Sequence, residues 1–356
     1  MDYNIEFKGY RSLKCFVTGH TGFKGAWLTQ WLDLLGAEIS AYALPPETDP
    51  NLYSETGSAN NLTDVEGDLN DYLSLKTAMD MSSPEVIFHL GAQALVRRSY
   101  REPKYTFNTN VGGTVNVLEA ARNCPSVKAV VIITSDKSYY NNEWHYGYRE
   151  NDRLGGKDPY SASKASAEIV TDAYYKSFFK DAGVGVATAR AGNVIGGGDW
   201  AEDRIIPDAV RALTAGQPVS VRHPSAVRPW QHVLEPLSGY LLLGSRLLKN
   251  PEKYSGPWNF GPPADSAQSV ASLMDQFIES YGEGRWEDVS AQLGAQPLES
   301  TMLMLAWDKA HRILNWKPRW DFTETVERTA AWYKAFYSGK DVSQLCKDEL
   351  SDYMLF

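Results

Sequence analysis

Apolar positions along the first 190 residues follow two alternating patterns. Short apolar runs at 13–18, 38–43, 85–90, 129–134 and 186–190 have the length and composition of strands that are covered on both faces. Between them, apolar residues recur at helical spacing in Trp27, Leu28, Trp31, Leu32 and Leu35, and similar patterns cover about 110–122 and 159–182. Strands that alternate with helical crossovers predict an α/β fold with a doubly wound parallel sheet.

The pattern changes after residue 193. Loops rich in glycine, proline, tryptophan and charge follow, with only scattered helical segments. We therefore expect a smaller C-terminal substrate domain. The predicted division assigns 1–192 and a return segment at about 228–262 to the nucleotide-binding domain, and 193–227 and 263–356 to the second domain.

Composition narrows the range of partners. The chain has 35 lysines and arginines against 44 acidic residues, a net charge of -9, and no basic block, so a nucleic-acid partner is not expected. The three cysteines and the histidines at 20, 89 and 232 show no metal-ligand spacing, which predicts neither a disulfide framework nor a metal site. The first residues lack a signal-peptide pattern, and no apolar run approaches the ~20 residues that span a bilayer. We expect a cytoplasmic protein without membrane contact.

A glycine turn follows the first predicted strand. Gly19, Gly22 and Gly25 form GxxGxxG between this strand and a helix, the arrangement in which backbone amides approach a dinucleotide pyrophosphate. Asp68 is a candidate acceptor for the adenine amino group. The second strand ends in "SAYALPP", which offers neither an acid for the ribose nor an arginine for a 2′-phosphate, although Lys24 is a candidate substitute. The motif leaves NAD and NADP open.

Two further groups of residues carry candidate chemistry. Tyr160 and Lys164 are four residues apart in a predicted helix, so both lie on one face, where an ammonium favours the phenolate. Ser135, Asp136 and Lys137 follow the apolar run at 129–134, at the strand end where open α/β sheets bind their ligands.

Together these motifs resemble the extended short-chain dehydrogenases/reductases of the Rossmann type, and among them the nucleotide-sugar 4,6-dehydratases. The segments "VTGHTGFKG", "HLGAQ", "NTNVGGTVNVLEA", "TSDKSYY", "DPYSASKASAE", "ARAGNVIGGGDWAEDRIIPD" and "RPWQHVLEPLSGYL" occur in the order of that family. The resemblance covers nearly the whole chain. It implies NAD as the cofactor, CDP-glucose as the substrate and a role in deoxysugar biosynthesis, including the 3,6-dideoxyhexoses of O-antigens.

The resemblance also implies site residues. Ser135, Asp136, Lys137, Tyr160 and Lys164 would be catalytic. The cofactor would contact Tyr160, Lys164 and the residues Gly19, Thr21, Gly22, Phe23, Lys24, Gly25, Asp68, Leu69, Leu90, Ala92, Gln93 and Asn110. The substrate would contact Asn193, Asp203, Arg204 and Arg228.

The implied reaction oxidises carbon 4 of the sugar, eliminates water across carbons 5 and 6, and returns the hydride to carbon 6. Elimination needs a base for the carbon 5 proton and an acid for the departing hydroxyl. The better-known dTDP-glucose members have Asp-Glu where this chain has Asp136-Lys137. Asp136 is the expected acid. Lys137 is either a neutral base, with its pKa far below the ordinary ~10.4, or a cation that stabilises the enolate.

Two other functions remain open. A nucleotide-sugar 4-epimerase would have the same fold and cofactor without the elimination, and a non-catalytic NAD(P)-sensing protein could lack the reactive residues. The helices near 98–122 and 160–182 carry apolar residues beyond one core-facing stripe, which predicts a homodimer or homotetramer.

Overall fold

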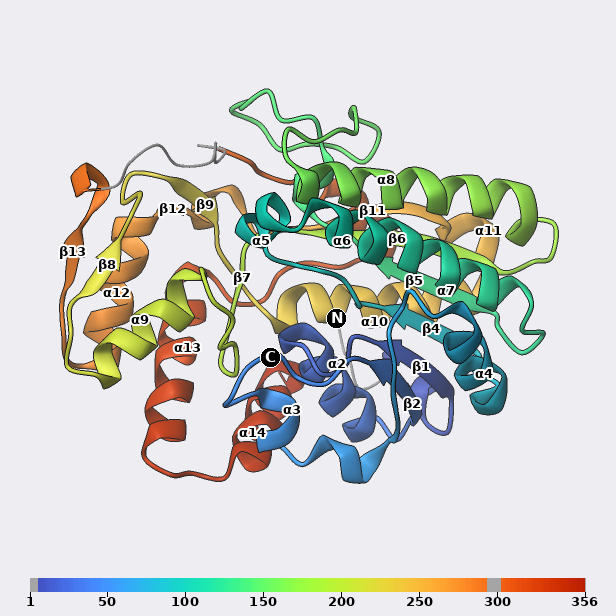
Figure 1. The fold of residues 1–356 in the computed structure, drawn as a ribbon, viewed down its shortest axis with the longest axis horizontal. Helices are drawn as coiled ribbons and strands as arrows, with labels where there is room; N and C mark the ends of the chain where they lie inside the picture. Colours follow the sequence, from blue (N-terminus) through green and yellow to red (C-terminus); the bar gives the residue numbers. More distant parts are fainter. Residues whose placement is uncertain (1–5, 293–301, 356) are drawn as a thin grey trace.

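A seven-stranded parallel sheet forms the centre of the computed structural model, which describes residues 6–292 and 302–355 (Figure 1). The strand order is β3-β2-β1-β4-β5-β6-β11, and every neighbouring pair is parallel. The strands are β1 Lys14–Thr18, β2 Glu38–Ala43, β3 Thr63–Glu66, β4 Val86–His89, β5 Ala129–Ile133, β6 Gly185–Ala191 and β11 Gly256–Phe260. The predicted doubly wound parallel sheet is confirmed.

Helices cover both faces of the sheet. One layer consists of α4 (Tyr72–Ser82), α7 (Gly113–Arg122) and α8 (Pro159–Tyr174), and the opposite layer contains α2 (Phe23–Leu34) and α10 (Leu234–Lys249). Successive strand residues face opposite layers. Ile87 and Val130 belong to the apolar cluster beneath the first layer, whereas Phe88 and Val131 belong to the cluster beneath the second. This two-sided burial explains the nearly continuous apolar strands.

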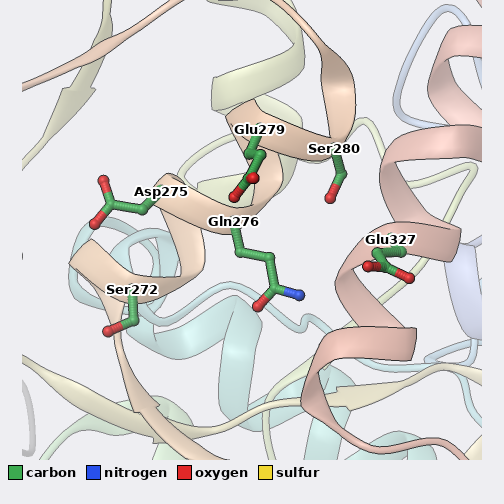
Figure 2. A pocket seen from close by; sticks show the side chains of 6 residues that line it. All are labelled: Ser272, Asp275, Gln276, Glu279, Ser280 and Glu327. Carbon is green, nitrogen blue, oxygen red and sulfur yellow. The ribbon is translucent and has the colours of Figure 1, made fainter.

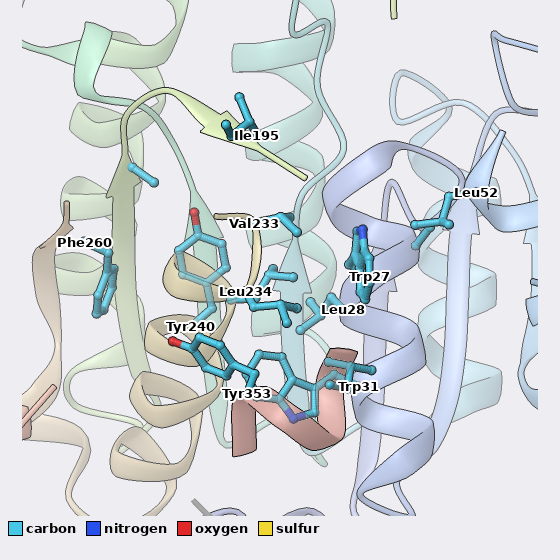
Figure 3. Close-up of a cluster of buried hydrophobic side chains, with 14 of the residues drawn as sticks. Trp27, Leu28, Trp31, Leu52, Ile195, Val233, Leu234, Tyr240, Phe260 and Tyr353 are labelled. Carbon is cyan, nitrogen blue, oxygen red and sulfur yellow. The ribbon is translucent and has the colours of Figure 1, made fainter. Parts of the chain in front are cut away.

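The C-terminal helix α14 (Val342–Leu355) closes the second layer against α2 (Figure 3). Trp31 of α2 meets Tyr353 of α14 edge to face, with ring centroids 5.5 Å apart. The fully buried Glu235 of α10 accepts hydrogen bonds from the Tyr353 hydroxyl at 2.8 Å and from the backbone N–H groups of Arg319 and Trp320 at 3.0 and 2.8 Å. Residues near the C-terminus therefore pack against α2, the helix that begins at the glycine turn, and hold it in place.

The remaining elements gather at one end of the molecule (Figure 1). Its larger helices are α9 (Ile205–Thr214), α12 (Val270–Tyr281) and α13 (Phe322–Tyr337). Its short strands are β7 Val194–Ile195, β8 Val219–Val221, β9 Val227–Pro229, β10 Gln231–His232, β12 Ala267–Ser269 and β13 Trp286–Asp288. Between these segments, α10 and β11 return to the main sheet. The predicted domain boundaries remain a prediction.

Short helices complete the chain. The α-helical ones are α3 Leu52–Glu55, α5 Val96–Arg101, α6 Pro103–Phe107 and α11 Pro251–Tyr254. The 3-10 turns are Lys8–Tyr10, Ser58–Asn61, Asp136–Ser138, Ala264–Ser266 and Ser290–Gln292, and π-helical turns occur at Asn108–Gly112, Tyr175–Phe179 and Ala310–Leu314. Within 6–292 and 302–355, none of the helices combines the length and apolar character that a bilayer crossing requires.

Candidate active site

The glycine turn lies where the strand order reverses between β1 and β4. Gly19 has a φ of 76°, and a Cβ at this residue would stand 2.6 Å from the Cα atom of Gly91, which follows β4. A Cβ on Gly25 would stand 2.1 Å from the Gly19 carbonyl oxygen. Gly22 differs, because its Cβ would find only that oxygen, at 3.5 Å. Two of the glycines therefore permit close packing, and the third leaves an open surface at the start of α2.

This open surface fits a pyrophosphate. Gly22 is the residue before α2 and offers no side chain to cap the helix, so its first N–H groups face outward with the positive end of the helix dipole. The Thr21 hydroxyl donates to the Leu44 carbonyl at 2.9 Å, which ties the turn to the end of β2. Beyond β2, Glu47 is exposed and paired with Arg98 at 2.8 Å.

The other predicted cofactor residues follow the neighbouring strands. Leu69 is buried against Gly91 and Gly113, whose Cβ positions would lie 2.8 and 2.9 Å from its side chain. One oxygen of Asp68 accepts two bonds from Asn70, both at 2.9 Å, so this carboxylate is held within its own turn.

Gln93 and Asn110 form a buried pair near the end of β4. The Gln93 backbone donates to the Asn110 side chain at 2.8 Å, and Asn110 donates to the Gln93 carbonyl and to Ser163 of α8 at 3.0 and 2.9 Å. Leu90 and Ala92 occupy the chain between β4 and this pair. The contact with Ser163 joins the β4 end to the helix that carries Tyr160 and Lys164.

Helix α8 begins beside the end of β5. Asp158 caps it by accepting from the Ser161 N–H at 2.9 Å, and Pro159 occupies its first turn. Tyr160 and Lys164 are both buried, and the Lys164 ammonium donates to the Ile133 carbonyl at 3.2 Å. Burial lowers the pKa of Lys164 to about 8 and raises the pKa of Tyr160 to about 12.

Ser135 and Asp136 lie in direct contact after β5. The Ser135 hydroxyl donates to the Asp136 carboxyl at 2.9 Å and accepts from the Lys137 N–H at 3.2 Å. Asp136 is 3% exposed, and burial raises the pKa of its carboxyl against the opposing effect of the Lys137 charge. Lys137 itself is half-buried. Burial raises the pKa of Tyr160, and a hydrogen bond to Ser135 partly offsets this effect. This interaction brings the α8 residue Tyr160 together with the predicted catalytic residues that follow β5.

Lys24 lies near this group of candidate catalytic residues. Burial lowers the pKa of Lys24 to about 7, the nearby Arg204 charge lowers it further, and Asp136 acts in the opposite direction. The sequence offered Lys24 as a substitute partner for a cofactor 2′-phosphate. In the structure Lys24 lies in the first turn of α2, and its charge interacts with those of Asp136 and Arg204. The 2′-phosphate role stays a prediction.

The predicted substrate residues lie on the second part of the chain. Arg204 donates a hydrogen bond to the Asp199 carboxylate at 2.9 Å. The negative charge of Asp199 raises the pKa of Arg204, and an electrostatic interaction with Tyr160 acts in the same direction. Arg228 of β9 is 9% exposed and donates to the Val227 carbonyl at 2.9 Å. Asn193 follows β6, and its carbonyl accepts from the Gln231 N–H at 3.1 Å.

Asp203 has a different environment. Its carboxylate pairs with Arg222 at 2.9 Å and with Arg97 of α5 at 3.7 Å. These ion pairs link α5 to the segment that precedes α9. Neither arginine was predicted, since an arginine in a polar loop has no spacing that distinguishes it from a surface charge.

A separate groove between α12 and α13 does not fit a nucleotide sugar (Figure 2). Asp275 and Glu279 of α12 and Glu327 of α13 line it, together with Ser272, Gln276 and Ser280. Three carboxylates would repel a diphosphate, whereas the sheet edge presents Lys24, Lys164 and Arg204.

Comparison with known proteins agrees with this geometry. The family model of GDP-mannose 4,6 dehydratase matches residues 16–254. The chain is 47% identical to the CDP-glucose 4,6-dehydratase of Salmonella typhimurium strain LT2, over 98% of each chain. This chain belongs to the GDP-mannose 4,6 dehydratase family.

Solved structures share the fold at low identity. A dTDP-glucose 4,6-dehydratase from Bacillus anthracis in complex with NAD has a TM-score of 0.76 and 22% identity, covering 93% of this chain and 99% of its own. A UDP-glucose 4-epimerase from Stenotrophomonas maltophila with bound NAD has a TM-score of 0.78 and 20% identity, covering 92% and 99%. The fold alone therefore does not separate dehydration from epimerisation.

Gly22 and Gly25 provide a matched test of the turn. We expect Gly25→Ala to unfold or strongly destabilise the protein, because its methyl group would overlap the Gly19 carbonyl oxygen at 2.1 Å. Gly22→Ala should fold, yet weaken NAD binding at least about tenfold, because its methyl group occupies the surface that faces the pyrophosphate. Thermal melting and titration with NAD measure the two effects. Unchanged NAD affinity in folded Gly22→Ala would contradict the assignment.

Proposed function

We propose that this protein is an NAD-dependent hydro-lyase that converts CDP-glucose to CDP-4-dehydro-6-deoxyglucose. The observation that carries the proposal is the convergence of Ser135, Asp136, Tyr160 and Lys164 at one sheet edge, in a chain that matches the Salmonella CDP-glucose 4,6-dehydratase over 98% of its length. A 4-dehydro-6-deoxy sugar is a precursor of deoxysugars. We therefore also propose a place in deoxysugar and O-antigen biosynthesis, in the cytoplasm.

In this proposal the glycine turn holds the cofactor pyrophosphate and Asp68 receives the adenine amino group. When bound there, NAD would supply a hydride acceptor and the same hydride's donor, so the overall reaction would be redox-neutral. Tyr160 removes the proton of the carbon 4 hydroxyl, and Ser135 hydrogen-bonds that hydroxyl. We assign Lys164 to favour the Tyr160 phenolate through its positive charge. Burial disfavours this phenolate, and the hydrogen bond to Ser135 and the charge of Arg204 act in the opposite direction.

Asp136 and Lys137 are assigned to the elimination. Burial raises the pKa of the Asp136 carboxyl, which favours its protonated form, and a protonated carboxyl can donate its proton to the departing carbon 6 hydroxyl. We assign Lys137 as the base for the carbon 5 proton. Arg204 and Arg228, with Asn193 and Asp203, are assigned to the substrate, because guanidinium groups bind diphosphate oxygens bidentately.

Purified protein incubated with NAD and four nucleotide-glucoses tests the function directly. We expect CDP-glucose to give a 4-keto-6-deoxy product, which absorbs strongly in alkali, whereas an epimerised sugar does not. A galactose product would identify a 4-epimerase instead. If none of the four sugars is converted, the result would support a non-catalytic protein. A faster reaction with the thymidine sugar would overturn the assignment of cytosine as the preferred nucleotide base.

Lys137 variants separate its two candidate roles. Lys137→Met should still form NADH in a single turnover but should block solvent deuterium entry at carbon 5, because oxidation does not need this base. Lys137→Arg should also fail in elimination, since a guanidinium does not give up its proton at working pH. Stopped-flow absorbance and mass spectrometry measure the two steps.

Lys128 is the matched control, because it precedes β5, is 61% exposed and pairs with Glu85. Lys128→Met should retain both steps. A Lys137→Arg enzyme with more than about a tenth of the wild-type elimination rate, a barrier change below about 1.4 kcal/mol, would favour the electrostatic role.

We further propose that the helices near 98–122 and 160–182, which include α6, α7 and α8, associate in a homodimer or homotetramer. Ile169 of α8 is 59% exposed, and Tyr100, Phe107 and Phe178 are between 39% and 45% exposed. Large apolar side chains gathered on one helical layer are typical of a subunit interface.

Ile169→Glu should weaken this association, because it places a charge in an apolar contact. Leu73→Glu is the matched control, since Leu73 is 75% exposed on α4, outside the proposed interface. Light scattering at micromolar concentration should show a lower mass for the first variant only. A monomeric wild-type protein would exclude the association.

A further inference from the structure

A buried polar cluster lies directly behind the strand end that carries Ser135, Asp136 and Lys137. Its centre is an ion pair between Glu168 of α8 and Arg190 of β6, which are 4% and 2% exposed. The guanidinium donates through Nη2 to one carboxylate oxygen at 2.8 Å and through Nε to the other at 2.9 Å. This bidentate geometry fixes both side chains in the plane of their contact.

The Glu168 carboxylate also accepts hydrogen bonds from two hydroxyl groups. Thr134 donates to the oxygen that receives Arg190 Nε, and Thr188 of β6 donates to the other oxygen at 2.6 Å. Each oxygen of Glu168 therefore receives two hydrogen bonds, from donors on β6 and on the residue that follows β5. Thr134 immediately precedes Ser135, so this contact anchors the first end of the reactive turn.

Arg190 anchors the other end. Its Nη1 atom donates hydrogen bonds to the Tyr139 hydroxyl at 2.5 Å and to the Glu150 carbonyl at 3.1 Å. The guanidinium carbon also lies 4.7 Å from the centroid of the Tyr139 ring. Tyr139 follows the 3-10 turn Asp136–Ser138 and donates to Asn259 of β11 at 2.8 Å. One ion pair thus holds the residues on both sides of the turn.

Glu168 also faces the charge of Lys164, one helical turn earlier on α8. Burial lowers the pKa of Lys164 to about 8, and the Glu168 carboxylate acts in the opposite direction. Other titratable groups near Lys164 include Tyr160, one turn earlier on α8, Lys24 of α2 and His89 of β4. Burial lowers the pKa of His89 to about 3, which leaves it neutral. Glu168 is the anion that compensates the buried ammonium.

We propose that Glu168 and Arg190 act as one positioning unit for the reaction, holding the turn at residues 135–138 in register with Tyr160 and keeping Lys164 charged. The inference deepens the proposed function and rests on it. Neither residue would contact the substrate. A cluster that served only folding would have no reason to join the two ends of the reactive turn and the charge of Lys164.

Glu168→Gln tests the unit, with Glu235→Gln as the matched control. Both glutamates are buried, and each carboxylate accepts hydrogen bonds from N–H groups. In each glutamine variant the side-chain NH2 group would face some of these N–H donors. For Glu168→Gln we expect the single-turnover rate of NADH formation to fall at least about tenfold at pH 8, with KM changed less than about threefold.

The pH profile gives the sharper outcome. The ammonium form of Lys164 is the active form, so activity declines as the pH rises through its pKa. Without the Glu168 charge this pKa falls, and the alkaline limb of the rate should move to lower pH by about one unit. The limb should stay in place in Glu235→Gln, even if both variants melt at similar temperatures.

Hydrogen–deuterium exchange provides a readout that does not require activity. We expect faster exchange over residues 134–139 in Glu168→Gln and unchanged exchange there in Glu235→Gln. Thr188→Val, which removes one hydroxyl at nearly constant volume, should fold and shift both readouts in the same direction by a smaller amount. It substitutes for Glu168→Gln if that variant does not fold.

An unshifted alkaline limb with unchanged exchange at 134–139 would overturn the proposal, as would equal effects in the Glu235 control. Failure of the wild-type protein to convert CDP-glucose is a separate result, because it would reject the proposed function while the exchange data still report on the positioning unit.

Discussion

The close approach of two strand ends determines where everything else in the site can lie. β1 and β4 are neighbours at the point where the strand order reverses, and their ends are so near that Gly19 and Gly91 leave no room for a Cβ between them. This contact lets α2 start at the sheet edge with its N-terminus open. β5 and β6, the next strands along, bring Ser135 and Asn193 to the same edge. The site is therefore a consequence of sheet order, as expected for a topological switch point.

Burial then sets the protonation of the residues that meet there. It lowers the pKa of Lys24 and Lys164 and raises the pKa of Asp136, which moves these three groups toward neutral pH, whereas it raises the pKa of Tyr160 to about 12, away from neutral pH. The phenolate of Tyr160 therefore depends on hydrogen bonds and positive charges beside it. A diphosphate would bring negative charge to a site that holds two lysines and Arg204. The same electrostatic balance explains why the acidic groove between α12 and α13 is a poor candidate for this ligand.

Periodicity predicted the central strands because they are buried on both faces, and the order of strands and helices led to the parallel sheet. β11 reads "GPWNF", in which glycine and proline obscure a strand pattern, and only its pairing with β6 makes it visible. Local spacing and family resemblance were sufficient to name the candidate catalytic residues. Arg97, Arg222 and the Glu168–Arg190 pair could not be named in this way, because each has its partner on a different segment of the chain and no local spacing marks such a contact. The position of Lys24 depended on the direction of α2, which a motif does not specify.

The pairing of Glu168 with Arg190 also fits the demands of the proposed chemistry. Oxidation, elimination and reduction on one bound sugar require the same few groups to serve successive steps without rearrangement. A displacement of about 1 Å at a reacting group can cost a hundredfold in rate. A 3-10 turn of three residues has few internal hydrogen bonds to resist such a displacement. Thr134 on one side is anchored to Glu168 of α8, and Tyr139 on the other side is anchored to Arg190 of β6, so two regular elements, a helix and a strand, supply that resistance. The two anchoring charges compensate each other, whereas either one alone would be strongly destabilising when buried.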